Sequence, residues 1–319
     1  MRAVVFDGAV KFVDRHPDPT PGDGEALVRI HLAGLCATDL QIARGYMGFR
    51  GVLGHEMVGT VVAGSESWIG RRVAAEINAP CRACDLCQSG LSNHCPNRTV
   101  MGIDGRDGCF ADLVAVPENN LHAVPDVVSD EEAVFIEPLA AAYQVLQQCP
   151  IESRMRVVVL GSGRLGLLVA QVLATTGCEL RVVGRNSETL SACEKKGIQA
   201  EHIDQFVPRA DCDVVVECTG SPDGVGLALP MIRPRGTLVL KSTCADAGTI
   251  NLAPVVINEI RIMGSRCGPF SEAIDALARR AVDVRSMVTR VLPIEQALNA
   301  FAAAEQSGAL KVMLKINPA

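Results

Sequence analysis

Four cysteines stand close together in the stretch CRACDLCQSGLSNHC: Cys81, Cys84, Cys87 and Cys95. Short C-x-x-C spacings let two thiolates reach one zinc ion, and the turn-rich QSGLSNH would let the chain fold back to close a tetrahedral cage. A chance cluster in a thiol-rich chain is the alternative, which the spacing and the loop composition disfavour. Because four thiolates leave no open coordination position, the sequence predicts a structural zinc site here.

A second set of candidate ligands is spread over three segments. GLCATDL contains Cys36 and Thr38, VLGHEMVG contains His55 and Glu56, and IEPLAAAY contains Glu137. One sulfur, one imidazole and one carboxylate are the donors of a catalytic zinc, whose fourth position stays open. Scattered Cys, His and Glu are common in any chain, so the spacing alone leaves open whether these side chains meet.

Length and charge indicate how many domains the chain forms and which classes of partner it could bind. A chain of 319 residues exceeds what one hydrophobic core usually serves, which favours two domains. The net charge of −6, the pI of about 5.6 and the 3% of aromatic residues disfavour a finger-type nucleic-acid module or binding to an anionic membrane.

The N-terminus MRAVVFDGAVKFVD does not resemble a signal peptide, so we expect a cytoplasmic protein. The thirteen cysteines are then thiols or metal ligands, and the eight that stand singly outside these two sets are mostly small buried residues.

Three regions of the chain differ in their pattern. Residues 1–137 contain short β-like runs such as EALVRIHLAG and MVGTVVAG, separated by turn residues, which predict a β-rich body. Residues 138–267 alternate apolar strands with helical patterns, which predicts βαβ units and a parallel sheet, and we read 155–174 as strand, turn and helix instead of a membrane span. Residues 268–319 end on the β-like KVMLKI, which we expect to complete the first domain. The predicted fold class is α/β, a β-rich domain plus a doubly wound parallel-sheet domain.

A glycine-rich loop follows the strand MRVVVL and opens the helix LGLLVAQVLA, the context that a dinucleotide-binding G-x-G-x-x-G motif requires. The first glycine would make the turn, the second would let pyrophosphate approach the backbone, and the third would let the helix pack on the strand. The N–H groups of the helix N-terminus would bind the phosphates. The predicted cofactor-binding residues of this loop are Gly161, Ser162, Gly163, Arg164, Leu165 and Gly166.

The turn after the next predicted strand, in LRVVGRNSETL, bears on which dinucleotide binds. NAD-binding folds usually place an Asp or Glu there to hold the ribose 2′-hydroxyl, and this chain has Arg185. A guanidinium would pair with a 2′-phosphate, so the sequence predicts a preference for NADP, with Asn186 and Ser187 as further cofactor contacts. A solvated surface arginine is the alternative.

GLCATDL, GHE, the four-cysteine lobe, EPLA and the G-x-G-x-x-G loop occur in this order and together resemble the zinc-dependent medium-chain dehydrogenases, the superfamily of alcohol, sorbitol and threonine dehydrogenases. The resemblance covers nearly the whole chain. It implies a GroES-like catalytic domain (1–137 and 268–319), a Rossmann domain (138–267), and Cys36 and His55 as catalytic zinc ligands. Glu137 is the favoured third ligand. Glu56 ligates zinc in some members and supports it from nearby in others, so the third ligand stays open between the two.

The resemblance also assigns roles outside the metal. Thr38 would accept the substrate proton and relay it, Thr219 in ECTG would lie near the nicotinamide ribose, and Lys311 would contact pyrophosphate. Ala37 and Gln41 replace the basic residue and the histidine of some alcohol dehydrogenases, so we do not expect a histidine-ended relay.

The implied function is hydride transfer between NAD(P), with NADP favoured, and a small-molecule alcohol or ketone. One structural and one catalytic zinc are implied, the latter as the Lewis acid that activates the alcohol. EPLA resembles the polyol and sugar branch, which favours a secondary alcohol of a polyol, sugar or cyclitol. A simple aliphatic alcohol or aldehyde dehydrogenase, a zinc-free reductase and a non-catalytic nucleotide sensor are the alternatives. A homodimer or homotetramer is expected, without nucleic-acid or membrane partners.

Overall fold

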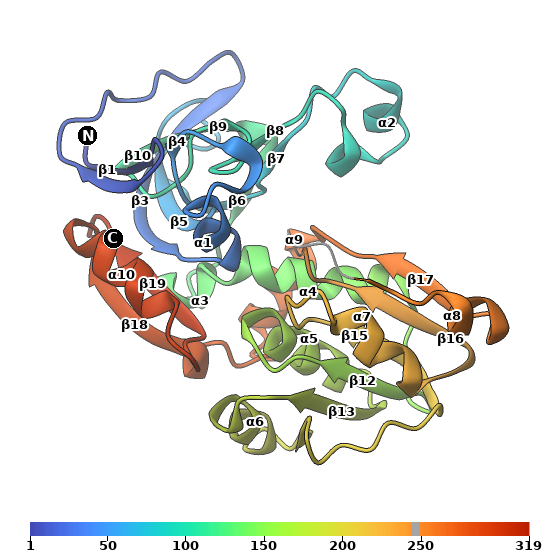
Figure 1. Cartoon of the computed structure of the whole chain (residues 1–319). Helices are drawn as coiled ribbons and strands as arrows, with labels where there is room; N and C mark the ends of the chain where they lie inside the picture. Colours follow the sequence, from blue (N-terminus) through green and yellow to red (C-terminus); the bar gives the residue numbers. More distant parts are fainter. Residues whose placement is uncertain (244–248, 319) are drawn as a thin grey trace. The chain divides into compact units, whose positions relative to one another are not determined.

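The computed structural model describes residues 1–243 and 249–318 (Figure 1). The chain folds into two compact units. Unit 1 comprises Met1–Glu137, Phe270–Arg280 and Val284–Ala319, and unit 2 comprises Pro138–Pro269 and Ala281–Asp283.

Unit 1 is mainly β-structure. Its strands are β1 (Ala3–Phe6), β2 (Val10–Val13), β3 (Glu25–Gly34), β4 (Gly51–Val52), β5 (Glu56–Ala63), β6 (Arg72–Ala75), β7 (Asn78–Ala79), β8 (Thr99–Met101), β9 (Gly105–Arg106), β10 (Leu113–Pro117), β11 (Leu121–Ala123), β18 (Val288–Pro293) and β19 (Lys311–Lys315). Its helices are α1 (Ala37–Ile42), η1 (Tyr46–Gly48), α2 (Asp85–Gln88), η2 (Ser92–His94), η3 (Glu118–Asn120), α3 (Asp130–Ala133), α9 (Phe270–Ala278), η5 (Arg285–Met287), η6 (Ile294–Gln296) and α10 (Ala297–Ala304).

The central strand of unit 1 is β3. It pairs antiparallel with β5 along one edge, and with β10 and β19 along the other. Its first half alternates, with Ala26, Val28 and Ile30 fully buried, as expected for a strand with one face on the core. Its second half is buried on both faces, and the chain then enters α1. The β3 C-terminus therefore delivers the residues that follow it into the interior of unit 1.

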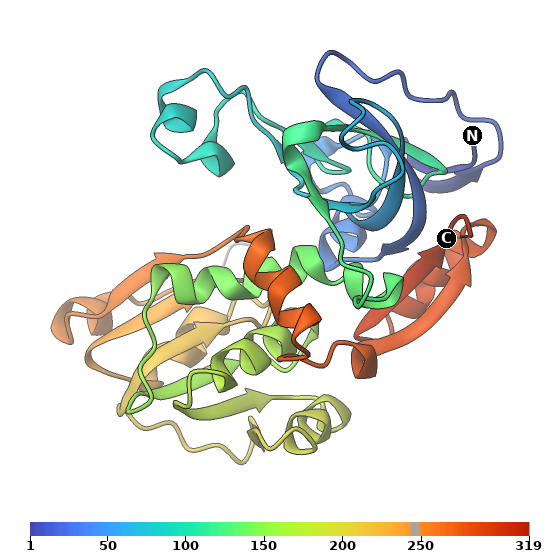
Figure 2. The same cartoon turned by 180° about the vertical axis from the view of Figure 1, so that it is seen from behind.

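The end of the chain returns to this sheet. Strand β19 lies beside β3, with Met313 opposite Gly34, and β18 pairs parallel to β19 at the sheet edge. Figure 2 shows this C-terminal segment, in red, from behind. A strand from the last ten residues thus contributes to the sheet that carries the first candidate ligand.

Unit 2 is a doubly wound parallel sheet. Its strands are β12 (Arg156–Leu160), β13 (Glu179–Gly184), β14 (Gln199–His202), β15 (Cys212–Glu217), β16 (Ile232–Leu240) and β17 (Arg261–Gly264). Its helices, together with α4, which begins at the end of unit 1, are α4 (Ile136–Gln148), α5 (Arg164–Ala174), α6 (Ser187–Glu194), α7 (Gly224–Ala228), η4 (Leu229–Met231) and α8 (Ala253–Ile257).

The strand order β14-β13-β12-β15-β16-β17 is the 3-2-1-4-5-6 order of the Rossmann fold, and all neighbours run parallel. The predicted α/β fold class is confirmed. Such sheets bind ligands outside the carboxyl ends of the strands, where the order reverses between β12 and β15. Residues 155–174 form β12 and α5, and no helix in the described ranges 1–243 and 249–318 is long and apolar enough to cross a bilayer.

Candidate metal centres and dinucleotide site

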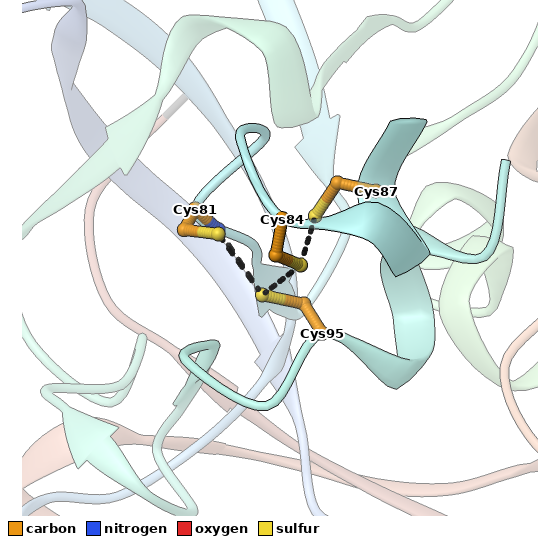
Figure 3. Close-up of side chains that lie close together, drawn as sticks. All are labelled: Cys81, Cys84, Cys87 and Cys95. Atoms are coloured by element: carbon orange, nitrogen blue, oxygen red, sulfur yellow. Dashed lines mark hydrogen bonds between the residues drawn. The ribbon is translucent and has the colours of Figure 1, made fainter. Parts of the chain in front are cut away.

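The four-cysteine lobe lies between β7 and β8 and stands out from the rest of unit 1 (Figure 1). Its four sulfurs converge (Figure 3): the Sγ of Cys95 is 3.4 Å from that of Cys81 and 3.8 Å from that of Cys84, which is 3.5 Å from that of Cys87. Tetrahedral zinc with Zn–S bonds of about 2.3 Å separates its sulfurs by about 3.8 Å. The sulfur positions therefore fit a closed tetrathiolate cage.

This lobe has little else to hold it. Leu86 and Leu91 are both exposed, and α2, at four residues, is too short to be stable alone. Backbone N–H groups lower the pKa of the Cys81 thiol to about 6. The backbone N–H of Cys87 acts in the same direction on Cys84, but burial and neighbouring thiols outweigh it and raise the Cys84 pKa to about 11. Four thiolates at this spacing need a cation to offset their repulsion. The residues present fit a structural zinc ion.

A second cluster lies in the interior of unit 1, where Cys36, His55 and Glu56 bring one ligand atom each to within 4.8 Å of one another. Strand register explains the convergence. Gly34 pairs with Glu56 across β3 and β5, so Cys36, two residues beyond the β3 end, lies next to His55 at the start of β5. The donors are a sulfur, an imidazole and a carboxylate, the set that leaves zinc an open position.

A buried carboxylate lies beside two of these residues. Asp39 is fully buried, its Oδ2 accepts the backbone N–H of Cys36 at 2.8 Å, and its Oδ1 lies 3.4 Å from Nδ1 of His55. Burial would lower the His55 pKa, but the nearby charges of Asp39 and Cys36 raise it well above its ordinary value. Asp39 therefore contacts both the backbone of Cys36 and the imidazole of His55.

The third residue of the cluster, Glu56, is 1% exposed and contacts Lys311, which is 2% exposed. The Nζ of Lys311 donates to Oε2 of Glu56 and lies 5.2 Å from the ring centroid of Phe135. The expected role of Lys311 as a pyrophosphate contact is wrong, because its ammonium group is buried and directed at a carboxylate.

Unsatisfied polar atoms gather at this cluster. In the described part of the chain, five buried side-chain nitrogen or oxygen atoms have no hydrogen-bond partner, and three of them are Oδ1 of Asp39, Nδ1 of His55 and Oε1 of Glu56. Buried polar groups without partners are rare, and a bound cation would satisfy all three of these atoms or their neighbours. The cluster thus fits a bound cation.

The other predicted residues of this site are placed as follows. The hydroxyl of Thr38 lies 3.8 Å from the Cys36 sulfur. Glu137 is half-buried in the first turn of α4 and is not one of the three residues whose ligand atoms converge. The structure therefore groups Glu56, and not Glu137, with the sulfur and the imidazole.

The loop between β12 and α5 has the backbone that G-x-G-x-x-G requires. Gly161 has φ of +111°, and a Cβ there would lie 2.6 Å from the carbonyl oxygen of Cys218. A Cβ on Gly166 would lie 2.0 Å from the Gly161 carbonyl oxygen, whereas a Cβ on Gly163 would meet no atom within 4 Å. The first and last positions exclude a side chain, and the middle one faces open space at the N-terminus of α5.

The loops after β12 and β13 are joined by a buried contact that the sequence analysis missed. The hydroxyls of Ser162 and Thr189 lie 2.7 Å apart, and the backbone N–H of Thr189 is bound by the Asn186 side chain, which caps α6. A Cβ on Gly184 would lie 2.3 Å from the Ser162 hydroxyl. The Asn-x-x-Thr cap and the neighbouring glycine were the available signals.

The remaining predicted cofactor residues also lie at carboxyl ends of strands. Arg185 is exposed after β13, and its carbonyl accepts a hydrogen bond from Nε2 of His202 at 2.9 Å. The backbone N–H and hydroxyl of Thr219, after β15, both donate to the buried Glu217, at 2.6 and 2.5 Å.

Ser187 is the first residue of α6 and is exposed. Arg164 and Leu165 begin α5 and are half-buried.

Known proteins are similar to this chain in sequence and in fold. The family model described as "Alcohol dehydrogenase GroES-like domain" matches residues 22–126, and "Glucose dehydrogenase C-terminus" matches residues 131–316. Human sorbitol dehydrogenase is 30% identical, with 96% of this chain and 93% of the relative covered. An alcohol dehydrogenase from Escherichia coli CFT073 complexed with NADH has a TM-score of 0.90 at 25% identity, with 99% of each chain covered. A protein from Sinorhizobium meliloti assigned as a zinc-binding dehydrogenase and bound to NADP has a TM-score of 0.87 at 26% identity, with the same coverage.

The chain belongs to the zinc-dependent medium-chain dehydrogenase superfamily, as the resemblance predicted, because these families match nearly its whole length. It is accordingly an oxidoreductase of the alcohol and polyol dehydrogenase class that uses zinc and NAD(P).

Proposed function

We propose that this enzyme interconverts a secondary alcohol of a polyol or sugar and the matching ketone, with NADP as cofactor. The convergence of Cys36, His55 and Glu56 carries the proposal. Sorbitol dehydrogenases and a 2-dehydro-3-deoxy-L-galactonate 5-dehydrogenase from Pseudoalteromonas atlantica, 28% identical, support a polyhydroxylated substrate. Residues 1–137 and 268–319 would form the catalytic domain, and 138–267 the dinucleotide-binding domain.

The residues of the cluster have distinct tasks in this proposal. Cys36, His55 and Glu56 would hold zinc, with Glu137 as an alternative third ligand. The ion would act as a Lewis acid that lowers the pKa of the substrate hydroxyl. Thr38, beside the Cys36 sulfur, accepts the substrate proton and passes it to the cofactor ribose. NADP, when bound, would supply the hydride acceptor.

Metal content and substrate range test this proposal together. We expect two zinc ions per chain and reduction of NADP by a polyol or sugar in a screen of alcohols. Activity should fall after dialysis against a chelator and return with zinc. A single zinc, retained when Cys36 is replaced, would contradict the proposal and support a nucleotide sensor or a zinc-free reductase. A preference for simple aliphatic alcohols would contradict the substrate class alone.

Arg185 supports the preference for NADP. It is exposed, and within residues 1–243 and 249–318 no carboxylate pairs with its guanidinium, which leaves the group available for a 2′-phosphate. We expect a higher kcat/KM with NADP than with NAD, and a reversal in Arg185→Asp. Arg209 is an exposed arginine of the same unit, and Arg209→Asp is the matched control. It should leave the ratio of kcat/KM with NADP to kcat/KM with NAD unchanged. A wild-type enzyme that prefers NAD would contradict this assignment.

An exposed sheet edge supports assembly into a homo-oligomer. In the described structure β17 pairs only with β16, so its other edge offers free backbone groups. Val256 and Ile257 in the adjacent α8 are each 77% exposed, and Ile262 on β17 is 40% exposed. We expect a dimer through this edge, measured by light scattering, and a monomer for Ile262→Asp. A monomeric wild type would contradict it.

Cysteine chemistry supports a cytoplasmic location. The cysteines that the structure describes are free thiols, as expected in a reducing compartment. One of the single cysteines, Cys244, lies outside the described residues. Thiol titration of the denatured, metal-free protein, purified without reductant, should find every cysteine reduced. Stoichiometric disulfides would argue for another compartment.

A further inference from the structure

A lysine from the last strand reaches the buried metal cluster. Lys311 opens β19, and its ammonium group contacts Oε2 of Glu56 in a place where both side chains are almost wholly shielded from water. Removing an ammonium and a carboxylate from water costs several kcal/mol each, so a buried pair persists only with close partners. Phe135 offers its ring face to the ammonium group as one further partner.

Backbone register fixes this lysine in place. The N–H of Leu35 donates to the carbonyl of Val312 at 2.9 Å, so the start of β19 is bonded to the segment that leads into Cys36. A Cβ on Gly34 would lie 2.5 Å from Oε2 of Glu56 and 3.2 Å from Cδ of Lys311. Glycine at position 34 therefore makes room for the ion pair, and the sheet determines where the ammonium group sits.

The two oxygens of Glu56 have different surroundings. Oε2 is engaged by Lys311, whereas Oε1 is buried with no hydrogen-bond partner in the described structure. Glu56 is also one of the three residues that offer a ligand atom to the cluster. One oxygen is thus committed to a fixed cation, and the other is left for a second cation.

We propose that Lys311 is a positioning residue that keeps Glu56 a one-oxygen ligand of the catalytic metal. This inference rests on the proposed function, since it requires a metal at Cys36, His55 and Glu56. By holding Oε2, Lys311 keeps the second oxygen out of the coordination position that the substrate needs. It also draws electron density from the carboxylate, so that Glu56 binds the metal less tightly than an unpaired carboxylate would.

Lys311→Met tests the proposal, because methionine is similar in length and shape but carries no charge. In this variant the metal would be the nearest positive partner of Glu56, so the carboxylate should bind through both oxygens. With cobalt exchanged into the catalytic site and zinc left in the lobe, we expect a weaker visible spectrum typical of higher coordination. Release of cobalt to a chelator should slow by about tenfold, the size of effect common for groups that hold a metal ligand.

Three comparisons separate this role from a general effect on folding. Lys315→Met is the matched control, since Lys315 is on the same strand and exposed, and its spectrum and release rate should equal the wild type. Lys311→Arg should restore the wild-type spectrum because it restores the cation. The metal-free Lys311→Met protein should melt at a lower temperature than metal-free wild type, because Glu56 is left buried and unpaired.

The outcomes distinguish the inference from the proposed function. A wild type without a metal at this site would overturn both. A wild type that holds the metal, with an unchanged cobalt spectrum and release rate in Lys311→Met, would overturn the inference alone. If Lys311→Met does not fold, Lys311→Arg provides the test. An altered cobalt spectrum in Lys311→Arg would overturn the inference, because a cation would then be present at position 311 without keeping Glu56 a one-oxygen ligand.

Discussion

The two metal-type clusters of unit 1 are built in opposite ways. The lobe gathers four identical donors from fifteen consecutive residues, projects from the unit and buries only Cys95 among its cysteines. The inner cluster gathers three different donors from two strand ends, and two further charged side chains, Asp39 and Lys311, support them. In the lobe the metal would organise the chain, whereas in the interior strand pairing and a buried ion pair position the side chains.

Metal loss should therefore have different consequences at the two places. A lobe without zinc loses the bonds that close it, because it has no apolar core of its own. The inner cluster without its ion keeps its strands, its ion pair and its capping carboxylate, and loses only reactivity. Four substitutions test this contrast, from the largest expected effect to the smallest.

The largest effect is expected from Cys36→Ser, which removes the sulfur of the inner cluster. Lewis-acid stabilisation is worth several kcal/mol, so kcat should fall by more than about a thousandfold. Zinc analysis should find one ion per chain, that of the lobe, and the melting temperature should change little. Loss of both ions, or a collapse of the fold, would remove the contrast between the clusters.

Cys95→Ser should have the reverse profile. Cys95 is the one fully buried sulfur of the lobe and neighbours two others. The lobe should lose its zinc and become sensitive to limited proteolysis, while kcat changes by less than about tenfold, because the inner cluster is intact. Cys178→Ser, a single half-buried cysteine, is the control and should behave as wild type. A protease-resistant lobe without zinc would show that the metal does not organise it.

Asp39→Asn sharpens the contrast by weakening the support of the inner cluster without removing a ligand. Asparagine can still accept the Cys36 N–H, but the negative charge facing His55 is lost. We expect affinity for the inner metal to fall by about ten- to a hundredfold in competition with a chelator, with the lobe zinc unaffected. An exposed change, Asp23→Asn, should leave both affinities as they were. Unchanged affinity in Asp39→Asn would argue against orientation by Asp39.

The smallest effect is expected at Asp130, which gives unit 1 an acid sensitivity that does not depend on metal. Burial would raise the Asp130 pKa, but hydrogen bonds and charges from His31 and Arg72 lower it below its ordinary value. A lowered carboxylate pKa stabilises the folded state above the unfolded pKa of about 3.9, and this stability is lost as pH falls through the folded pKa.

Asp130→Asn should therefore lower the free energy of unfolding by about 1–2 kcal/mol at pH 7. The difference from wild type should shrink below about pH 4 and be the same with and without chelator. Denaturant unfolding at several pH values measures it. A difference that disappears on metal removal would mean that Asp130 belongs to a metal site.

The sequence predicted the two regions unequally, and distance along the chain is the reason. The four cysteines of the lobe lie within fifteen residues, so their spacing alone indicated a shared ion. For the inner cluster, Cys36 and His55 were assigned through a family resemblance. The choice between Glu56 and Glu137 was open, because it depends on the register of β3 against β5. These ligand assignments remain predictions.

The role of Lys311 was predicted wrongly for the same reason. Nothing near KVMLKI indicates that its first lysine faces a carboxylate some 255 positions earlier, a contact that the pairing of β19 with β3 creates. In unit 2 the fold class and the family resemblance are confirmed, because strand, glycine loop and helix are contiguous. The buried partners Thr189 and Glu217 were missed, since ordinary polar residues carry no local signal of burial.

The position of β19 has a consequence for synthesis on the ribosome. Unit 2 consists almost entirely of residues 138–269 and so can fold while the rest of the chain is still being made. The sheet of unit 1 must wait for its final strand, and until Lys311 leaves the exit tunnel Glu56 has no countercharge. Nascent chains of this enzyme would therefore acquire a nucleotide fold early and a finished reaction centre only after β19 has emerged.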